Sequence, residues 1–94
     1  MTDEILEQLF ASKTQAKLLT FLFKNAEKTF YQREIVRAMG DSLSTVQYEI
    51  KRLVDLGLLK TETKKRKKYY TLDKTFYLFP ELRSIIFKSI QKVM

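Results

Sequence analysis

The chain of 94 residues, with 45% hydrophobic residues, two glycines and one proline, is predicted to fold as one domain over residues 1–94 and not to be disordered. It has no cysteine or histidine, which excludes disulfides and zinc sites, and its longest apolar stretch falls far short of the ~20 residues of a membrane helix. Its net charge of +7 lies entirely in residues 60–94, so one basic region on a neutral body needs an explanation.

Two helices are predicted first along the chain. The first covers residues 2–11, where apolar positions follow helical spacing. Ser12 and Gln15 have the spacing of a capping box, and one apolar stripe follows them, so the second helix runs to about Lys24. Both helices are interpreted as scaffold for the core.

A pair of amphipathic helices follows, at residues 32–39 and 43–56. Each is ended by a glycine, Gly40 or Gly57, which can take the left-handed geometry of a helix C-terminus. Ser42 can cap the second helix after a short break. Two helices joined by a short turn with a glycine are typical of a helix-turn-helix, here spanning 32–56.

A β-hairpin and a last helix complete the predicted elements. Residues 58–63 and 69–72 are predicted strands, and the basic run 64–68 between them is predicted to be a charged loop. Residues 80–93 form an apolar stripe of helical period that begins at a proline. The expected fold is mainly α with a small β-hairpin: a three-helix core, a hairpin at 58–72, and additional N- and C-terminal helices.

The second helix of the pair has the features of a helix that enters the DNA major groove. Its front is small or polar, its back is apolar, and the groove, about 12 Å wide, admits little more than the helix itself. Hydroxyls at its N-terminus suit phosphate oxygens and base edges, and Gln47 suits adenine. The candidate contacts are Ser42, Ser44, Thr45, Gln47, Tyr48, Lys51 and Arg52. Amphipathic helix pairs with a glycine turn are also common in other all-α domains.

The hairpin strengthens this interpretation because its basic tip directly follows the second helix. Cations there can straddle the phosphates that flank the groove. The candidates are Lys64, Lys65, Arg66, Lys67 and Lys68. The alternative is a solvated tip that aids solubility, or a nuclear-import signal. Tyr69 is a further candidate for phosphate contact, because strand alternation turns it away from Tyr70. Arg33, on the first helix of the pair, is another candidate. The alternative is that Glu34 or Glu49 holds this arginine in a structural role.

These residues resemble the winged helix-turn-helix transcriptional regulators of bacteria and archaea, including the ArsR-like ones. The match lies in Gly40, Ser42, Ser44-Thr45-Val46, Lys51-Arg52-Leu53, Leu56-Gly57-Leu58-Leu59 and Lys68-Tyr69-Tyr70-Thr71-Leu72. The chain is also similar to the winged-helix module that precedes nucleotidyltransferase domains, through Leu9-Phe10-Ala11-Ser12-Lys13-Thr14, Phe30-Tyr31-Gln32-Arg33-Glu34 and Phe79-Pro80-Glu81-Leu82-Arg83-Ser84. The resemblance implies a recognition helix at 43–56, a wing tip at 64–68 and a dimer interface on the terminal helices. Asp41 and Leu43 depart from the family pattern, which usually has an apolar residue and a proline or small residue there.

The sequence therefore predicts sequence-specific binding of double-stranded DNA by a transcriptional regulator. An enzyme is not expected, because Glu27, Glu34, Glu49, Asp55 and Glu62 are scattered singly on helix surfaces or the hairpin. The alternatives are a winged helix that binds RNA or protein, and a nonspecific nucleoid-type DNA binder. We expect a cytoplasmic protein with no metal, cofactor or membrane partner.

A homodimer is expected through the terminal helices. Ile86, Ile90 and Val93 lie on the apolar stripe of the last helix and are candidates for contact with a second copy. Pairing there would set two recognition helices about 34 Å apart, one turn of DNA, and would favour a palindromic operator. The alternative is that the stripe covers the core of its own domain.

Overall fold

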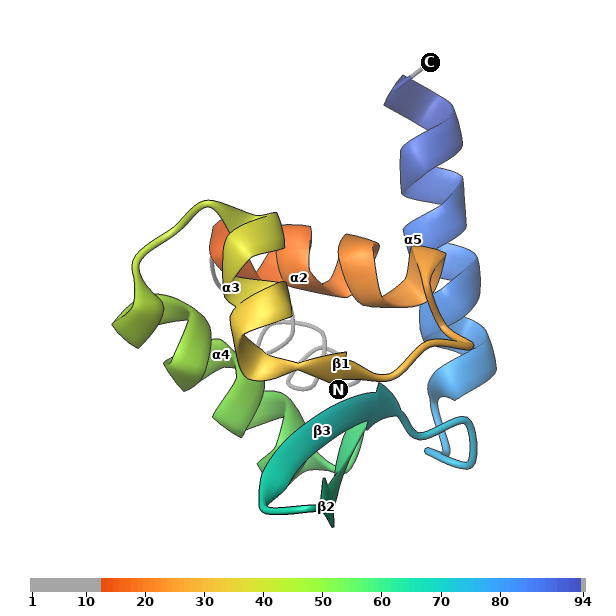
Figure 1. The fold of residues 1–94 in the computed structure, drawn as a ribbon. Coiled ribbons are helices and arrows are strands. Elements are labelled where there is room, and N and C mark those ends of the chain that lie inside the picture. Colours follow the sequence, from red (N-terminus) through yellow and green to blue (C-terminus); the bar gives the residue numbers. More distant parts are fainter. Residues whose placement is uncertain (1–12, 94) are drawn as a thin grey trace.

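The computed structural model describes residues 13–93, with side chains through Lys88, so the helix predicted at 2–11 lies outside the described residues. The fold class is confirmed: the described chain is mainly helical, with one small antiparallel sheet (Figure 1). Its elements in chain order are α2 (Lys13–Lys24), β1 (Phe30–Tyr31), α3 (Gln32–Met39), α4 (Leu43–Leu56), β2 (Leu59–Lys64), β3 (Lys67–Leu72) and α5 (Phe79–Val93).

The helix α2 lies at the centre of the packing. It contacts α3, α4 and α5, and it also touches β3 of the sheet (Figure 1). Its apolar positions recur at helical spacing, so Leu18, Leu19 and Leu22 are buried with at most 1% exposure. Ile35 of α3 and Val46, Ile50 and Leu53 of α4 close the core from one side, and Phe79, Leu82 and Ile86 of α5 close it from another.

The ends of α3 and α4 follow the sequence signals. Gly40 and Gly57 have φ of 72° and 102°, the left-handed region in which glycine carries no steric penalty. The amide of Gly40 donates to the carbonyl of Val36, and that of Gly57 to the carbonyls of Leu53 and Val54. Each glycine thus satisfies helix carbonyls that would otherwise lack a partner.

The sheet has three strands in the order β1-β3-β2, all antiparallel. The strand β1 was not expected, because two residues are too few to show a period in the sequence. It pairs Phe30 with Tyr70 and Tyr31 with Tyr69. This pairing fixes the start of α3, directly after β1, against the hairpin.

The predicted charged loop at 64–68 is wrong in its length. The strands extend to Lys64 and from Lys67, which pair with each other, so the turn consists of only two residues, Lys65 and Arg66. Both have positive φ, 50° and 68°, the geometry of a tight two-residue hairpin turn that usually selects Asn and Gly. At the basic tip, strand pairing therefore continues up to a two-residue turn.

The assignment of Ile86 to a face between copies also needs correction. Its side chain is only 2% exposed and lies in the core of its own chain, beneath α5. Ile85, one position earlier, is exposed instead, at 37%. The side chains of Ile90 and Val93 lie outside the described residues.

Candidate nucleic-acid interface

The helix α4 separates an apolar back from a polar front, as the sequence predicts. Its front presents exposed Ser44, Gln47, Tyr48 and Lys51, the last paired with Asp55 at 3.0 Å. Because side chains three and four positions apart share a face, the front stays continuous over three turns. The polar side chains predicted to meet DNA are therefore available on one surface.

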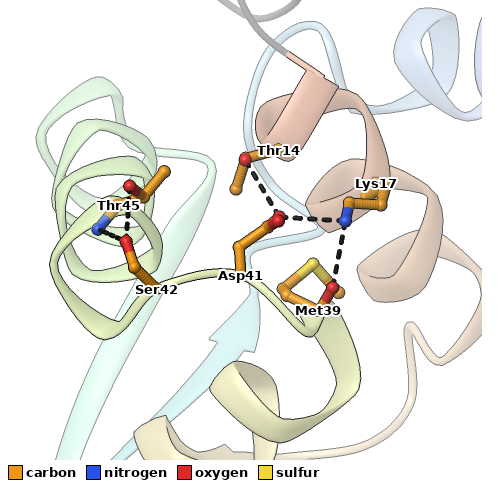
Figure 2. Close-up of polar contacts among 6 residues, drawn as sticks. All are labelled: Thr14, Lys17, Met39, Asp41, Ser42 and Thr45. Atoms are coloured by element: carbon orange, nitrogen blue, oxygen red, sulfur yellow. Dashed lines mark hydrogen bonds and ion pairs between the residues drawn. The ribbon is translucent and has the colours of Figure 1, made fainter.

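The first turn of α4 is held by hydroxyl groups. The Ser42 hydroxyl donates to Oγ1 of Thr45 at 2.8 Å, and the Thr45 amide donates back to Oγ of Ser42 at 3.3 Å (Figure 2). This reciprocal cap satisfies one of the free amides at the helix start. Since Oγ1 of Thr45 accepts from Ser42, its own proton remains available to donate outward from an exposed position.

Asp41 anchors the turn between α3 and α4 to α2. Its carboxylate accepts from the Thr14 hydroxyl at 3.0 Å and lies 2.9 Å from Nζ of Lys17, which also donates to the carbonyl of Met39 at 3.0 Å (Figure 2). Hydrogen bonds from Lys17 and then Thr14 lower the pKa of Asp41 below its ordinary value. An acid at this position, unusual by resemblance, thus has a structural partner in α2.

The hairpin presents its five basic residues in an exposed arrangement. Lys64, Lys65, Arg66, Lys67 and Lys68 are all exposed, and Nζ of Lys64 lies 3.7 Å from Glu62 on the same strand. The register pairs Thr63 with Lys68 and Lys64 with Lys67, so successive pairs point to opposite faces of the hairpin. The cations therefore surround the tip instead of covering one side.

One face of the hairpin borders the front of α4. A shallow hollow of about 390 Å³ lies between them, lined by Gln47, Lys51 and Asp55 of α4 and by Thr61 and Lys68 of the hairpin, among others. Figure 1 shows α4 and the hairpin side by side below α2. Lys68 thus shares this surface with Gln47 and Lys51, whereas the other four wing cations do not line it.

A second hollow shares Gln32, Lys68 and Tyr70 with the first, and Tyr31, Arg33 and Lys67 complete its lining. The hydroxyls of Tyr31 and Tyr69 are 2.8 Å apart, and their ring centroids are 4.6 Å apart. Nζ of Lys67 lies 5.1 Å from the centre of the Tyr31 ring, and the Arg33 guanidinium lies 5.9 Å from it. These are cation–π distances. Tyr31 therefore brings Arg33 and Lys67 together, a role that no signal in the sequence indicated.

The hydrogen bond between the two hydroxyls separates their acidities. The bond to Tyr69, helped by the nearby Lys67 charge, lowers the pKa of Tyr31, while the same bond raises the pKa of Tyr69. Tyr69 is half-buried and already engaged with Tyr31. Of the two phenols, Tyr31 is the one that the cations approach.

Glu49 is not the surface acid that the sequence suggested. It is 4% exposed and accepts a hydrogen bond from Nε2 of Gln15, itself 1% exposed, at 3.0 Å. Arg52 has a nitrogen 3.9 Å from the same carboxylate, and its guanidinium lies 5.7 Å from the centre of the Tyr48 ring. Arg52 is half-buried, so it braces α4 and orients Tyr48 more than it faces outward. Glu34 accepts from the Tyr31 amide at 2.8 Å at the start of α3.

The described residues offer little else that resembles a site. Within residues 13–93, no group of three or more acidic, histidine or cysteine side chains is placed to hold a metal ion. None of the described helices is long and apolar enough to cross a membrane.

No protein-family model and no curated protein matches this sequence, but solved structures do match it. The transcriptional repressor BigR from Xylella fastidiosa aligns with a TM-score of 0.71 and 15% identity, over 99% of this chain and 88% of that chain. MepR, a transcription regulator of the Staphylococcus aureus efflux pump MepA, aligns with a TM-score of 0.69 and 22% identity, over 97% and 69%. Sso10a-2, a DNA-binding protein from Sulfolobus solfataricus, aligns with a TM-score of 0.62 and 21% identity, over 81% and 77%. The chain therefore has the winged helix-turn-helix fold.

Proposed function

We propose that this protein is a transcriptional regulator, not an enzyme, that binds double-stranded DNA in a sequence-specific manner. In this proposal residues 1–94 form one winged-helix domain. The helix α4 enters the major groove, and the wing formed by β2 and β3 follows the phosphates beside it.

The observation that carries the proposal is the hollow shared by α4 and the wing. Gln47 and Lys51 line it from the helix, and Lys68 lines it from the wing. A duplex presents base edges and flanking phosphates side by side, so a protein that reads it needs amide and ammonium groups in the same relation. This surface supplies both, on a helix whose back is fixed in the core.

The charge distribution of the chain also supports DNA as the partner. The excess of +7 lies in residues 60–94, and five consecutive cations of that excess are exposed at the wing. Phosphate neutralisation with release of counterions is the main source of affinity for nucleic acids. We assign phosphate contact to Arg33 and the wing residues 64–68, and base contact to the front of α4, chiefly Ser44, Gln47 and Tyr48.

The structural neighbours add support of a general kind. BigR is described as a transcriptional repressor and Sso10a-2 as a DNA-binding protein. A variant of MepR that aligns with a TM-score of 0.68 and 22% identity, over 97% of this chain and 68% of that chain, is bound to an oligodeoxyribonucleotide. This neighbour is thus a protein of the same fold with DNA bound to it.

We further propose that the protein acts as a homodimer through α5. Figure 1 shows the C-terminal turns of α5 extending beyond the rest of the described chain. The sequence places Ile90 and Val93 on this part of the helix, and Ile85 is exposed nearer its start. Sedimentation equilibrium should give twice the chain mass, and Ile90→Lys should shift it to the monomer. A monomer mass for the unaltered protein at high concentration would reject the dimer.

A salt titration tests DNA binding itself. Affinity for a duplex pool should fall with salt at a log–log slope of about −3 or steeper, because each phosphate contact contributes about −0.9. Selection from a random duplex pool should then return a consensus sequence. Tighter binding of single-stranded RNA than of duplex DNA, or duplex binding independent of salt, would overturn the proposal. Binding without a consensus would indicate the nonspecific nucleoid-type alternative.

A further inference from the structure

Leu43, the first residue of α4, is an exposed apolar side chain on an otherwise polar front. It is 53% exposed, although leucine is among the residues most often buried. The other large exposed apolar side chains of the described chain are Tyr48, Tyr77 and Ile85. Leu43 is the aliphatic one on α4, and it has no hydrogen-bonding group with which to bind phosphate.

The position of Leu43 relates it to the shared hollow. Leu43, Gln47 and Lys51 are spaced four residues apart, so they form one row along the helix. The second and third members of this row line the hollow beside the wing. Leu43 therefore extends the row beyond the hollow, towards the N-terminal end of α4.

The first turn of α4 is also held firmly, which limits how far Leu43 can move. Ser42 and Thr45 bond to each other on either side of it, and Asp41 ties the preceding turn to Thr14 and Lys17 (Figure 2). A turn fixed at two points gives the Cα–Cβ bond of Leu43 a defined direction.

The chemistry of the major groove contains one apolar group that suits such a side chain. The C5-methyl of thymine projects into the groove, whereas the other bases present hydrogen-bond donors and acceptors there. Gln47, one turn further along, has the amide that pairs with N6 and N7 of adenine. Leucine and glutamine on one row of the helix therefore suit two adjacent A·T pairs. The leucine would contact a thymine methyl, and the glutamine amide would pair with an adenine.

We propose that Leu43 is a specificity-determining residue that contacts the C5-methyl group of a thymine in the operator. This inference rests on the proposed function, because it requires α4 to lie in the major groove. It adds a base preference that phosphate contacts do not supply, since those are independent of sequence.

The test removes the methyl group from the DNA and the side chain from the protein, separately and together. Each thymine of a duplex selected from the random pool is replaced in turn by deoxyuridine, which differs by that methyl alone. One replacement should weaken binding by the unaltered protein about three- to fivefold, the effect of one buried methyl group. The variant Leu43→Ala should bind thymine and deoxyuridine duplexes equally at that position.

The matched control is Tyr77→Ala, which removes another exposed side chain, 70% exposed and outside α4. It should keep the full preference for thymine. Equal methyl effects in the unaltered protein and in Leu43→Ala, or no sensitive thymine at all, would overturn the inference while salt-dependent duplex binding stands. Failure of duplex binding itself would instead reject the proposed function, so the two failures are distinguishable.

Discussion

The carboxylate of Asp41 lies 2.9 Å from the ammonium group of Lys17, which connects the turn before α4 to the central helix α2. The same carboxylate accepts a hydrogen bond from Thr14 (Figure 2). The polar contacts of Asp41 with Lys17 and Thr14 therefore help to hold α4 against α2, in addition to apolar packing.

Replacing Asp41 by asparagine should lower the melting temperature by a few degrees, because the ion pair with Lys17 is lost. The matched control is Asp55→Asn, which breaks the ion pair with Lys51 between side chains 75% and 63% exposed. An exposed pair of this kind contributes little to stability, so that variant should melt close to the unaltered protein. Equal effects of the two substitutions in thermal denaturation would contradict the anchoring role.

The contribution of Asp41 should depend on pH in one direction. Its pKa is lowered in the folded protein by the bonds from Lys17 and Thr14. A carboxyl whose folded pKa is depressed stabilises fully above its unfolded pKa of about 4, and this stabilisation is lost as the pH falls through the folded pKa. Urea denaturation of the unaltered protein and Asp41→Asn should thus give a gap near pH 7 that closes in acid. A difference in stability between the two proteins that widens in acid would contradict the lowered pKa of Asp41.

The buried pair of Glu49 and Gln15 gives a second stability prediction. Glu49→Ala should lower the free energy of unfolding by about 1–3 kcal/mol, since it removes the acceptor of a buried amide. Glu49→Gln keeps a carbonyl acceptor and should lose less. The exposed acid Glu62 serves as control, and Glu62→Ala should change stability by about 0.5 kcal/mol or less. Chemical denaturation measures all three, and an alanine effect at Glu49 as small as that at Glu62 would refute the role.

Replacing Arg66 in the turn of the wing by glycine should have opposite effects on stability and on DNA binding. Arg66 has φ of 68°, a conformation that is unfavourable for residues with a Cβ by about 1–2 kcal/mol. Arg66→Gly should therefore raise the melting temperature while weakening DNA binding through the lost charge. Arg66→Ala, which removes the charge and keeps the unfavourable backbone, should weaken binding equally with no gain in stability. Identical melting temperatures of the two variants would argue against strain at this turn.

The two cations of β3, Lys67 and Lys68, give a prediction about the salt dependence of binding. Lys67→Ala and Lys68→Ala should each make the log–log slope of affinity against salt shallower by about 0.9, the value for one phosphate contact. The effect should be the same on specific and random duplexes, because phosphates carry no sequence information. Lys88→Ala, on α5, removes an exposed charge far along the chain from the wing and should leave the slope unchanged. A slope altered equally by all three would mean that only net charge matters.

Sequence reasoning identified the elements whose ends carry local signals. Gly40 and Gly57 end their helices in the left-handed conformation, and Ser42 caps α4, as their neighbours along the chain imply. The length of the wing turn was predicted wrongly. Lys65 and Arg66 are not residues that normally form a two-residue turn, so the whole basic run 64–68 was predicted to be a loop.

The remaining differences come from contacts between distant residues. Glu49 is buried because Gln15, 34 positions earlier, meets it from α2. Nothing around Tyr31 in the sequence indicates that its ring and hydroxyl contact Tyr69, or that Arg33 and Lys67 lie close to its ring. The burial of Ile86 in its own core could not be predicted either. An apolar stripe on a helix has the same period whether it faces the core of its own chain or another chain.

The most direct test of the shared surface is a heteronuclear NMR titration of the ¹⁵N-labelled protein with a selected duplex. Amide shifts should change most at residues 42–51, in the first turns of α4, and at 64–68 on the wing, with Arg33 beside them. Amides in the middle of α2 and at residues 82–88 of α5 should change least. Changes concentrated on α5, or on the wing without α4, would contradict the claim that helix and wing act as one DNA-binding surface.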